Sequence, residues 1–400
     1  MRHAHRGAPL STQATERLVA TFILITLLIV ACALSKRIKP ARKLLDGIAL
    51  TLAFGSIIAT SAILVPLMFI FYPLYRCYPS IWYLIGNSLW CPMWALCILT
   101  TEVFGGMRVV LYGELPPAGE PLLITPNHLS SLDWIVVLCV AARCDALSGL
   151  RFIMKASLAK MPLLGWGLKL HHSVFIRSRP EGREPGKSKA ARAASVKRDM
   201  GELVSTVKSL TSHPVACESR NSTCWIVLYA EGTRLIPEQH TRSLAFAQES
   251  GKQPYKYLLQ PRSKGLGAVL DGGKPHLKHA LDLTVAYRGF SAECEKNTRP
   301  AGLSDGIVSG DQEVHVLLRR VPLPLKADDD HQAWLDGVWM EKERALARWE
   351  HDGSFEAERL EELPLAARPL IGGLVAYAAC AAAAASASVL GAVKLYHVFG

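Results

Sequence analysis

The sequence lacks the cysteine pattern of a protein held together by disulfides or by zinc. Its ten cysteines are scattered, no C-x-x-C pair occurs, and several lie inside apolar runs, among them Cys32, Cys91, Cys97 and Cys380. A disulfide framework or a zinc site would need paired cysteines at short, regular spacing. The cysteine pattern therefore argues against both classes. No internal repeat is visible either.

No nucleic-acid recognition motif accompanies the positive charge of the chain, and no basic helix carries interleaved aromatic residues. The 45 Lys and Arg residues against 34 Asp and Glu residues give a net charge of +11. Such a charge suits a protein that works at an anionic membrane surface on anionic substrates, since each basic group near such a surface contributes about 1 kcal/mol. Nucleic acid is the disfavoured partner.

Charged residues are missing from four long apolar runs, at residues 18–35, 47–75, 77–101 and 369–393. Each run approaches or exceeds the roughly 18 to 20 residues that span a bilayer as a helix. The second and third runs are separated only by a short turn around Arg76, so they are expected to form a helical hairpin. An integral membrane protein is predicted.

The first apolar run has an alternative interpretation as a secretory signal peptide, because arginines precede it and it is short for a span. Against this, a basic cluster follows where a small-residue cleavage site should be: Lys36, Arg37, Lys39, Arg42 and Lys43. Basic residues at the end of a span favour the cytosolic side. The hairpin returns the chain to that side, so the residues beyond Glu102 are expected in the cytosol.

Short β-rich segments alternate with helical ones after residue 105. Strands are expected at residues 107–113, 121–126, 171–177, 224–230, 280–289 and 313–321. Helices are expected at residues 131–142, near 155–169, at 190–210, and as an amphipathic helix at 332–350. This alternation predicts an α/β fold with a largely parallel central sheet flanked by helices.

The stretch "ITPNHLSSLDWIVV", residues 124–137, places a histidine and an aspartate between a strand and a helix. Pro126 ends the strand, and Asp133 falls in the first turn of the helix, where negative charge is favoured. His128 can fold back onto Asp133, whose carboxylate would hold one ring nitrogen protonated and leave the other as a base. The simpler alternative is a helix-capping aspartate beside a polar loop residue. A metal pair lacks a third ligand nearby.

A second polar motif, Glu231, Gly232, Thr233 and Arg234, follows the strand expected at 224–230. Gly232 lets backbone amides approach a ligand closely, and the guanidinium of Arg234 matches a phosphate group. Alone, this tetrapeptide is better explained as a tight turn. Both motifs follow strands of one domain, and the carboxyl ends of strands are where open α/β sheets bind ligands.

The two motifs together resemble the first and third conserved blocks of the glycerolipid acyltransferases, the family of 1-acyl-sn-glycerol-3-phosphate acyltransferases. The blocks are "NHLSSLD" (127–133) and "YAEGTR" (229–234). The similarity continues through residues 152–179, 257–270 and 334–349, and covers roughly residues 105 to 350.

The resemblance implies catalytic roles for His128 and Asp133. It implies substrate-binding roles for Asn127, Glu231, Gly232, Thr233 and Arg234, with a second-block arginine at Arg177 or Arg179, and no metal. Two departures stand out: the second block has two candidate arginines after Phe175, and the fourth block at 283–289 lacks its usual proline. Lys155 and Lys160 are expected at the membrane interface, with contact to substrate phosphates as the alternative.

The apolar runs and the resemblance together divide the chain into five expected parts. They are an N-terminal segment (1–46) with the helix at 18–35, a membrane hairpin (47–104), an acyltransferase domain (105–330), an amphipathic helix and linker (331–363), and a C-terminal membrane helix (364–400).

The activity expected from the resemblance is acyl transfer from acyl-CoA, a co-substrate rather than a cofactor, to the free hydroxyl of lysophosphatidate, which gives phosphatidate. The alternatives are another lysophospholipid acceptor, such as lysocardiolipin or lysophosphatidylinositol, or a non-catalytic membrane protein that binds anionic lipid. The expected location is the endoplasmic reticulum membrane, with the catalytic domain facing the cytosol.

Overall fold

The computed structural model describes residues 39–176, 189–212, 224–274, 276–289, 312–326 and 328–360. Several sequence expectations fall outside these ranges: the helix at 18–35, the C-terminal helix at 364–400, and the two second-block arginines, Arg177 and Arg179.

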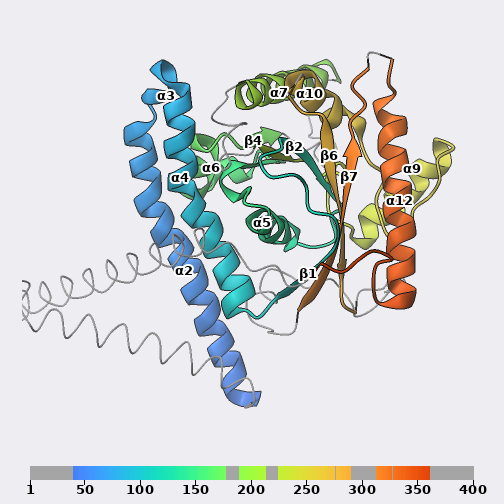
Figure 1. Ribbon diagram of the computed structural model, residues 1–400, viewed down its shortest axis with the longest axis horizontal. Coiled ribbons are helices and arrows are strands. Elements are labelled where there is room, and N and C mark those ends of the chain that lie inside the picture. The colour runs from blue at the N-terminus through green and yellow to red at the C-terminus, as the bar shows by residue number, and fades with distance from the viewer. Residues whose placement is uncertain are drawn as a thin grey trace, which may run out of the picture.

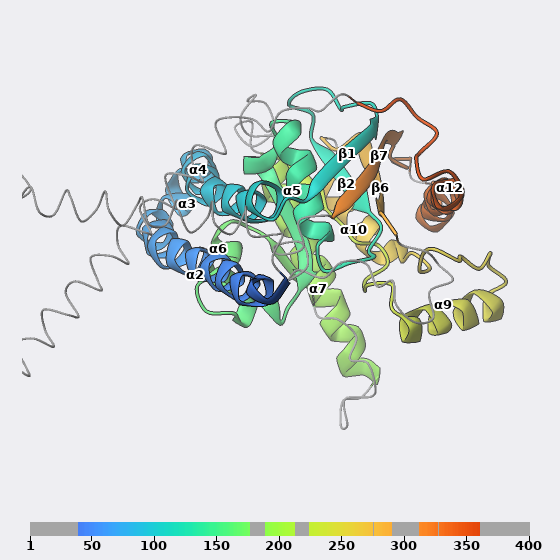
Figure 2. The same cartoon turned by 90° about the horizontal axis from the view of Figure 1, so that it is seen from below.

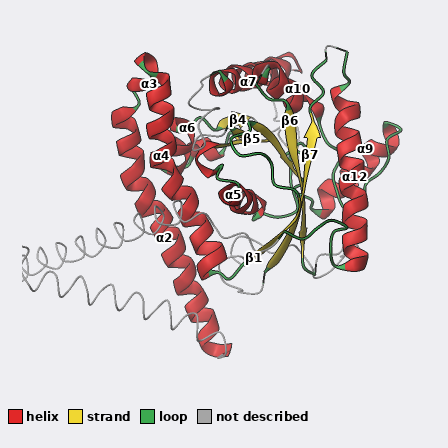
Figure 3. Cartoon of the chain, viewed as in Figure 1, coloured by secondary structure: helices red, strands yellow, loops and turns green. Residues whose placement is uncertain are grey.

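A seven-stranded sheet in the order β1-β7-β6-β2-β5-β3-β4 forms the centre of the described residues (Figure 3). Every neighbouring pair is parallel except β6 and β7, which are antiparallel. The predicted α/β fold with a largely parallel sheet is therefore confirmed. The strands are β1 (Arg108–Gly113), β2 (Leu122–Pro126), β3 (Leu150–Lys155), β4 (Val174–Ile176), β5 (Trp225–Val227), β6 (His279–Tyr287) and β7 (Glu313–Pro322).

Helices cover both faces of the sheet (Figure 1). Seen from below, α5 lies between the sheet and the N-terminal helices, and α12 lies on the opposite side, against β6 and β7 (Figure 2). The helices are α2 (Lys39–Phe71), α3 (Leu74–Cys77), α4 (Pro79–Ile98), α5 (Asp133–Arg143), α6 (Leu164–Leu170), α7 (Lys189–Thr211), α9 (Pro237–Glu249), α10 (Ser263–Gly273) and α12 (His331–Asp352).

Helices α2 and α4 lie side by side as the expected hairpin, with the short helix α3 at the turn (Figure 1). Two segments of the described residues, Phe54–Phe71 and Pro79–Val103, are long and apolar enough to cross a membrane. They differ in burial: 22% of the first segment is buried inside the protein, against 67% of the second. Helix α2 therefore presents an apolar outer face, which includes Ile58 and Ile70.

Buried polar contacts fasten the hairpin to the α/β domain. The guanidinium of Arg151, on β3, donates to the Asn87 side chain of α4 over 2.5 Å. Beyond α4, a π-helical turn (Leu99–Phe104) carries Glu102, which pairs with Arg143 at the end of α5. Polar groups buried in an apolar setting are costly unless they are paired, so these contacts fix where the hairpin lies relative to α5.

The sequence interpretation was wrong at residues 155–169, where one helix was expected. Lys155 ends strand β3, a 3₁₀ turn (Leu158–Lys160) follows, and α6 begins only at Leu164. Pro162 lies inside this stretch and cannot continue a helix, which explains the error. Strand β3 was not predicted either. Helices α9 and α10 were not predicted, and the strand expected at 171–177 is limited to Val174–Ile176.

Candidate active site

The two sequence motifs meet at one edge of the sheet because their strands are neighbours. Strands β2 and β5 pair in parallel, with Ile124 opposite Val227, so both carboxyl ends lie at the same edge. The backbone amide of Leu235 donates to the carbonyl oxygen of His128 over 2.8 Å. The amide of His128 in turn donates to Oε1 of Glu231 over 3.4 Å. The two motifs are thus hydrogen-bonded to each other through the main chain of His128.

The His128 ring lies against the Asp133 carboxylate, with 2.8 Å between Nδ1 and Oδ2. The Asp133 side chain is completely buried, whereas that of His128 is 22% exposed. The same Oδ2 accepts the amide of Ser130 over 2.8 Å, which fixes the carboxylate at the start of α5. With Nδ1 protonated toward Asp133, Nε2 is the nitrogen available to act as a base.

Tyr287 holds the other oxygen of Asp133, a contact that the sequence analysis missed. Its hydroxyl donates to Oδ1 over 2.6 Å, from the last residue of β6. Burial and the nearby carboxylate raise the pKa of Tyr287 well above its usual value, so the phenol remains a donor. This tyrosine lies in the segment 283–289 that resembles the family's fourth block without its proline. Here that block supports the buried aspartate.

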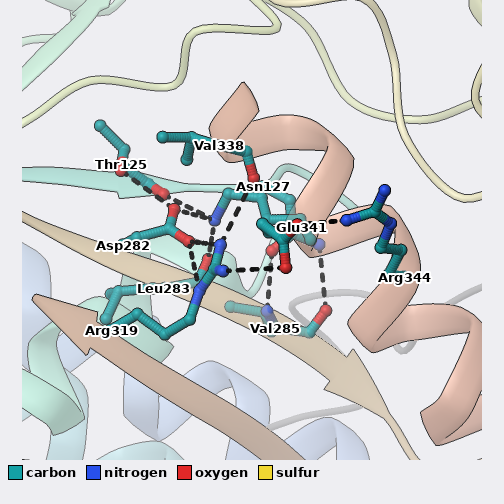
Figure 4. Close-up of polar contacts among 10 residues, drawn as sticks. Thr125, Asn127, Asp282, Leu283, Val285, Arg319, Val338, Glu341 and Arg344 are labelled. Atoms are coloured by element: carbon teal, nitrogen blue, oxygen red, sulfur yellow. Dashed lines mark hydrogen bonds and ion pairs between the residues drawn. The ribbon is translucent and has the colours of Figure 1, made fainter. Parts of the chain in front are cut away.

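The side chains of Asn127 and Glu231 form hydrogen bonds with main-chain groups in this structure. The fully buried Asn127 amide donates to the carbonyl of Val285 over 3.0 Å and accepts from its amide over 2.7 Å, which joins the ends of β2 and β6 (Figure 4). Glu231 is 1% exposed and accepts the His128 amide. The direct substrate contacts expected of these two side chains stay predictions.

Burial raises the pKa of Glu231 to about 8, although the His128 amide and the charge of Lys342 oppose the rise. The carboxyl group is therefore mainly neutral at pH 7 in the folded protein. A neutral carboxyl can still accept the His128 amide through its carbonyl oxygen. Its hydrogen bond with the His128 amide therefore needs no charge on Glu231.

We expect Glu231→Gln to retain more activity than Glu231→Ala at pH 7, because glutamine keeps the acceptor for the His128 amide. The stability comparison has a definite sign. An unfolded glutamate loses its proton near pH 4.5 and the folded one near 8, so the wild-type protein loses stability as pH rises through that window. Glu231→Gln lacks this loss. Its melting temperature should rise relative to wild type between those two pH values and then level off; parallel curves would contradict the buried, neutral carboxyl.

The turn after Glu231 places Gly232, Thr233 and Arg234 toward the outside. Gly232 has φ +74°, a left-handed conformation that favours glycine, and it is exposed. The Arg234 side chain is exposed as well. A second arginine, Arg262, has its Nη1 atom 3.5 Å from where a β-carbon on Gly232 would lie. Arg262 lies in the segment 257–270, which resembles the family, but no role was predicted for it from the sequence.

The remaining sequence candidates have different outcomes. Lys155 is exposed at the end of β3, at the same sheet edge as His128, and Lys160 is exposed in the following turn. Arg177 and Arg179 lie outside the described residues. Within the described ranges, no three His, Cys, Asp or Glu side chains form a group that could hold a metal ion.

Comparisons with known proteins show what the chain is similar to. A family model described as acyltransferase matches residues 108–252. The chain is 26% identical over 285 residues to 1-acyl-sn-glycerol-3-phosphate acyltransferase epsilon of Mus musculus, covering 70% of this chain and 71% of the relative. It is 28% identical over 302 residues to lysocardiolipin acyltransferase 1 of Danio rerio, covering 75% of this chain and 70% of the relative.

A solved structure, the 1-acyl-sn-glycerophosphate acyltransferase PlsC of Thermotoga maritima, matches with a TM-score of 0.39 and 14% identity over 72% of this chain and 96% of that one. The residue blocks, the site geometry and the family match lead to one conclusion. Residues 108–252 match the acyltransferase family model, and the chain is similar to the 1-acyl-sn-glycerol-3-phosphate acyltransferases.

Proposed function

We propose that the protein transfers an acyl chain from acyl-CoA to the free hydroxyl of a lysophospholipid, with lysophosphatidate as the acceptor and phosphatidate as the product. The observation that carries this proposal is the pair of His128 and Asp133, held 2.8 Å apart beside the exposed turn of Gly232 and Arg234. An acceptor whose hydroxyl lies near a phosphate needs a base to remove the hydroxyl proton. It also needs an anion-binding turn to hold the phosphate.

The reaction needs a general base and an activated acyl donor. His128 Nε2 takes the proton from the acceptor hydroxyl as its oxygen attacks the thioester carbonyl. The carbon–sulfur bond then breaks, and the proton passes from His128 to the departing CoA thiolate. Such base assistance accounts for about 10²- to 10⁴-fold in rate. The thioester is already activated, so the mechanism needs no covalent acyl-enzyme.

The turn at residues 232–234 is the proposed binding site for the acceptor phosphate. Arg234 is exposed there, and the guanidinium of Arg262 lies close to Gly232. Guanidinium groups match the geometry of phosphate oxygens, and the absence of a side chain on Gly232 leaves room for them. The second-block arginine, Arg177 or Arg179, is proposed to join them.

The apolar helices supply the proposed membrane attachment. The Phe54–Phe71 segment of α2 is apolar and largely exposed. Leu158 and Met161, before α6, and Trp166, within it, are exposed too. Both lipid substrates have acyl chains that reside in a bilayer, so a domain held against the membrane meets them without extracting them into water. We propose an integral membrane protein of the endoplasmic reticulum, with the site and its soluble co-substrate on the cytosolic side.

An acceptor panel tests the proposal. Membranes that contain the expressed protein are given one labelled acyl-CoA and, separately, lysophosphatidate, lysocardiolipin and lysophosphatidylinositol. Phosphatidate should be the main labelled product. Labelling of lysocardiolipin alone, the acceptor named for one relative, would move the assignment to that lipid. Lipid binding without acyl transfer to any acceptor would favour a non-catalytic lipid-binding protein.

Arg234→Lys tests, in the same assay, which of the two substrates binds at the turn of residues 232–234. Lysine keeps the charge but loses the planar pair of donors, so we expect a higher KM for lysophosphatidate and little change in KM for acyl-CoA. Arg242→Lys on α9 is a matched control, because that arginine is also exposed. Loss of acyl-CoA affinity with acceptor affinity retained would assign this turn to the other substrate.

A further inference from the structure

A lysine is buried in the middle of α12, on the helix face that packs against the domain. Residues of this face recur every three or four positions: Leu335, Val338, Trp339, Lys342, Leu346 and Trp349. All are apolar or aromatic except Lys342, whose side chain is completely buried. Burial of an ammonium group is costly unless it is paired and hydrogen-bonded, so its partners indicate why it is there.

Lys342 contacts the two central strands that lead into the active site. Figure 4 labels its partners on these strands, Thr125, Asp282 and Leu283. Its Nζ lies 2.5 Å from Oδ1 of Asp282. It also donates to the main-chain carbonyls of Thr125 on β2, over 2.9 Å, and of Leu283 on β6, over 2.6 Å. One ammonium group therefore joins neighbouring strands near the ends that carry His128 and Tyr287.

Neutralising the Asp282 carboxylate does not by itself explain why Lys342 is buried here. Asp282 has a second cation, Arg319, whose Nη2 donates to Oδ2 over 2.7 Å, and it also accepts the Thr125 hydroxyl over 3.2 Å. What Lys342 alone adds is the pair of bonds to the two carbonyl oxygens. Thr125 is three residues before His128, and Leu283 is four before Tyr287.

The same lysine acts on the second motif through its charge. Lys342 opposes the upward pKa shift that burial imposes on Glu231, and Glu231 accepts the His128 amide. Trp339, one turn earlier in α12, faces the same carboxyl group. Helix α12 therefore lies close to both sequence motifs of the active site. It lies outside the residues 108–252 that match the family model.

We propose that Lys342 is a positioning residue for acyl transfer: its bonds to Thr125 and Leu283 hold the ends of β2 and β6 so that His128, Asp133 and Tyr287 keep their relative places. The inference rests on the proposed function for its kinetic consequence. It makes α12 part of the catalytic unit. A role in packing alone would predict effects on stability only.

Three variants separate positioning from charge balance. Lys342→Met removes the ammonium group and leaves the buried Asp282 with one cation. Lys342→Met combined with Asp282→Asn removes both charges, so it should unfold at a higher temperature than the single variant. It still lacks the bonds to the two carbonyl oxygens. Arg319→Ala is the matched control, because it removes a cation from the same carboxylate and keeps those bonds.

Activity and local exchange are measured on each full-length variant. We expect the double variant to show kcat lower by on the order of 10²-fold, with KM little changed, because small misplacement of catalytic groups has effects of that size. Amide hydrogen exchange in residues 127–133 should be faster in both Lys342 variants than in Arg319→Ala. The exchange measurement does not require activity, so it decides the inference even if no lysophospholipid is acylated, an outcome that would contradict only the proposed function.

Two results would overturn the inference. One is a double variant whose kcat returns to the Arg319→Ala level together with its melting temperature, because Lys342 would then matter only for charge balance. The other is unchanged exchange in residues 127–133 in a folded Lys342→Met protein.

Discussion

His128→Ala should lower kcat for acyl transfer by about 10²- to 10⁴-fold with little change in KM for either substrate. A base acts mainly in the transition state, so its removal leaves ground-state binding largely intact. The ring is partly exposed and contacts Asp133 through one nitrogen, so the fold should survive its loss. Initial rates over a range of lysophosphatidate and acyl-CoA concentrations give the two constants.

His276→Ala is the matched control for this prediction, since His276 is exposed on the segment before β6. Its kcat and melting temperature should equal those of wild type. Equal kcat in His128→Ala and His276→Ala would remove His128 from the chemistry. A fall in kcat that is matched by a large fall in melting temperature would make His128 a structural residue.

Asp133→Asn should be comparably severe, although the two side chains have almost the same shape. The carboxylate accepts three hydrogen bonds, from the His128 ring, the Ser130 amide and the Tyr287 hydroxyl. If the asparagine oxygen faces Tyr287, its NH₂ group faces the His128 ring and the Ser130 amide. The ring would then have to present an acceptor at Nδ1, which puts the proton on Nε2, where the base is needed. In a Ser-His-Asp catalytic triad, where an aspartate orients a histidine in the same way, this substitution lowers kcat by about 10⁴-fold.

Tyr287→Phe provides a graded comparison with Asp133→Asn. It removes one of the three hydrogen bonds to Asp133 and leaves the carboxylate to orient His128. We expect a smaller decrease in kcat than for Asp133→Asn. Wild-type kcat in Asp133→Asn would show that the carboxylate does not control the ring.

The parts of the site that depend on neighbouring residues could be predicted from the sequence. His128 and Asp133 are five positions apart across a strand-to-helix turn, so local geometry alone brings them within reach of each other. The turn at Gly232 follows its strand directly. The alternation of strands and helices was enough to predict the parallel sheet, and parallel order places both motifs at one edge.

The long-range supports could not be predicted, because they depend on strand register and helix packing. Tyr287 is 154 residues from Asp133, and Lys342 is 217 residues from Thr125. The periodicity of α12 places Lys342 on the buried face, but nothing in the local sequence identifies its partners on β2 and β6. Asn127 could be assigned to the first block from the sequence. Its hydrogen bonds with Val285 could not be predicted, because they depend on where β6 lies beside β2.

The most direct test of the central claim is one paired measurement on protein in phospholipid nanodiscs. Labelled acyl-CoA and lysophosphatidate are supplied to wild type and to His128→Ala, and labelled phosphatidate is followed with time. The account predicts steady formation of phosphatidate by wild type and a rate lower by about 10²-fold or more in the variant. Equal rates in the two proteins, or no acylated product from any lysophospholipid with folded wild type, would contradict it.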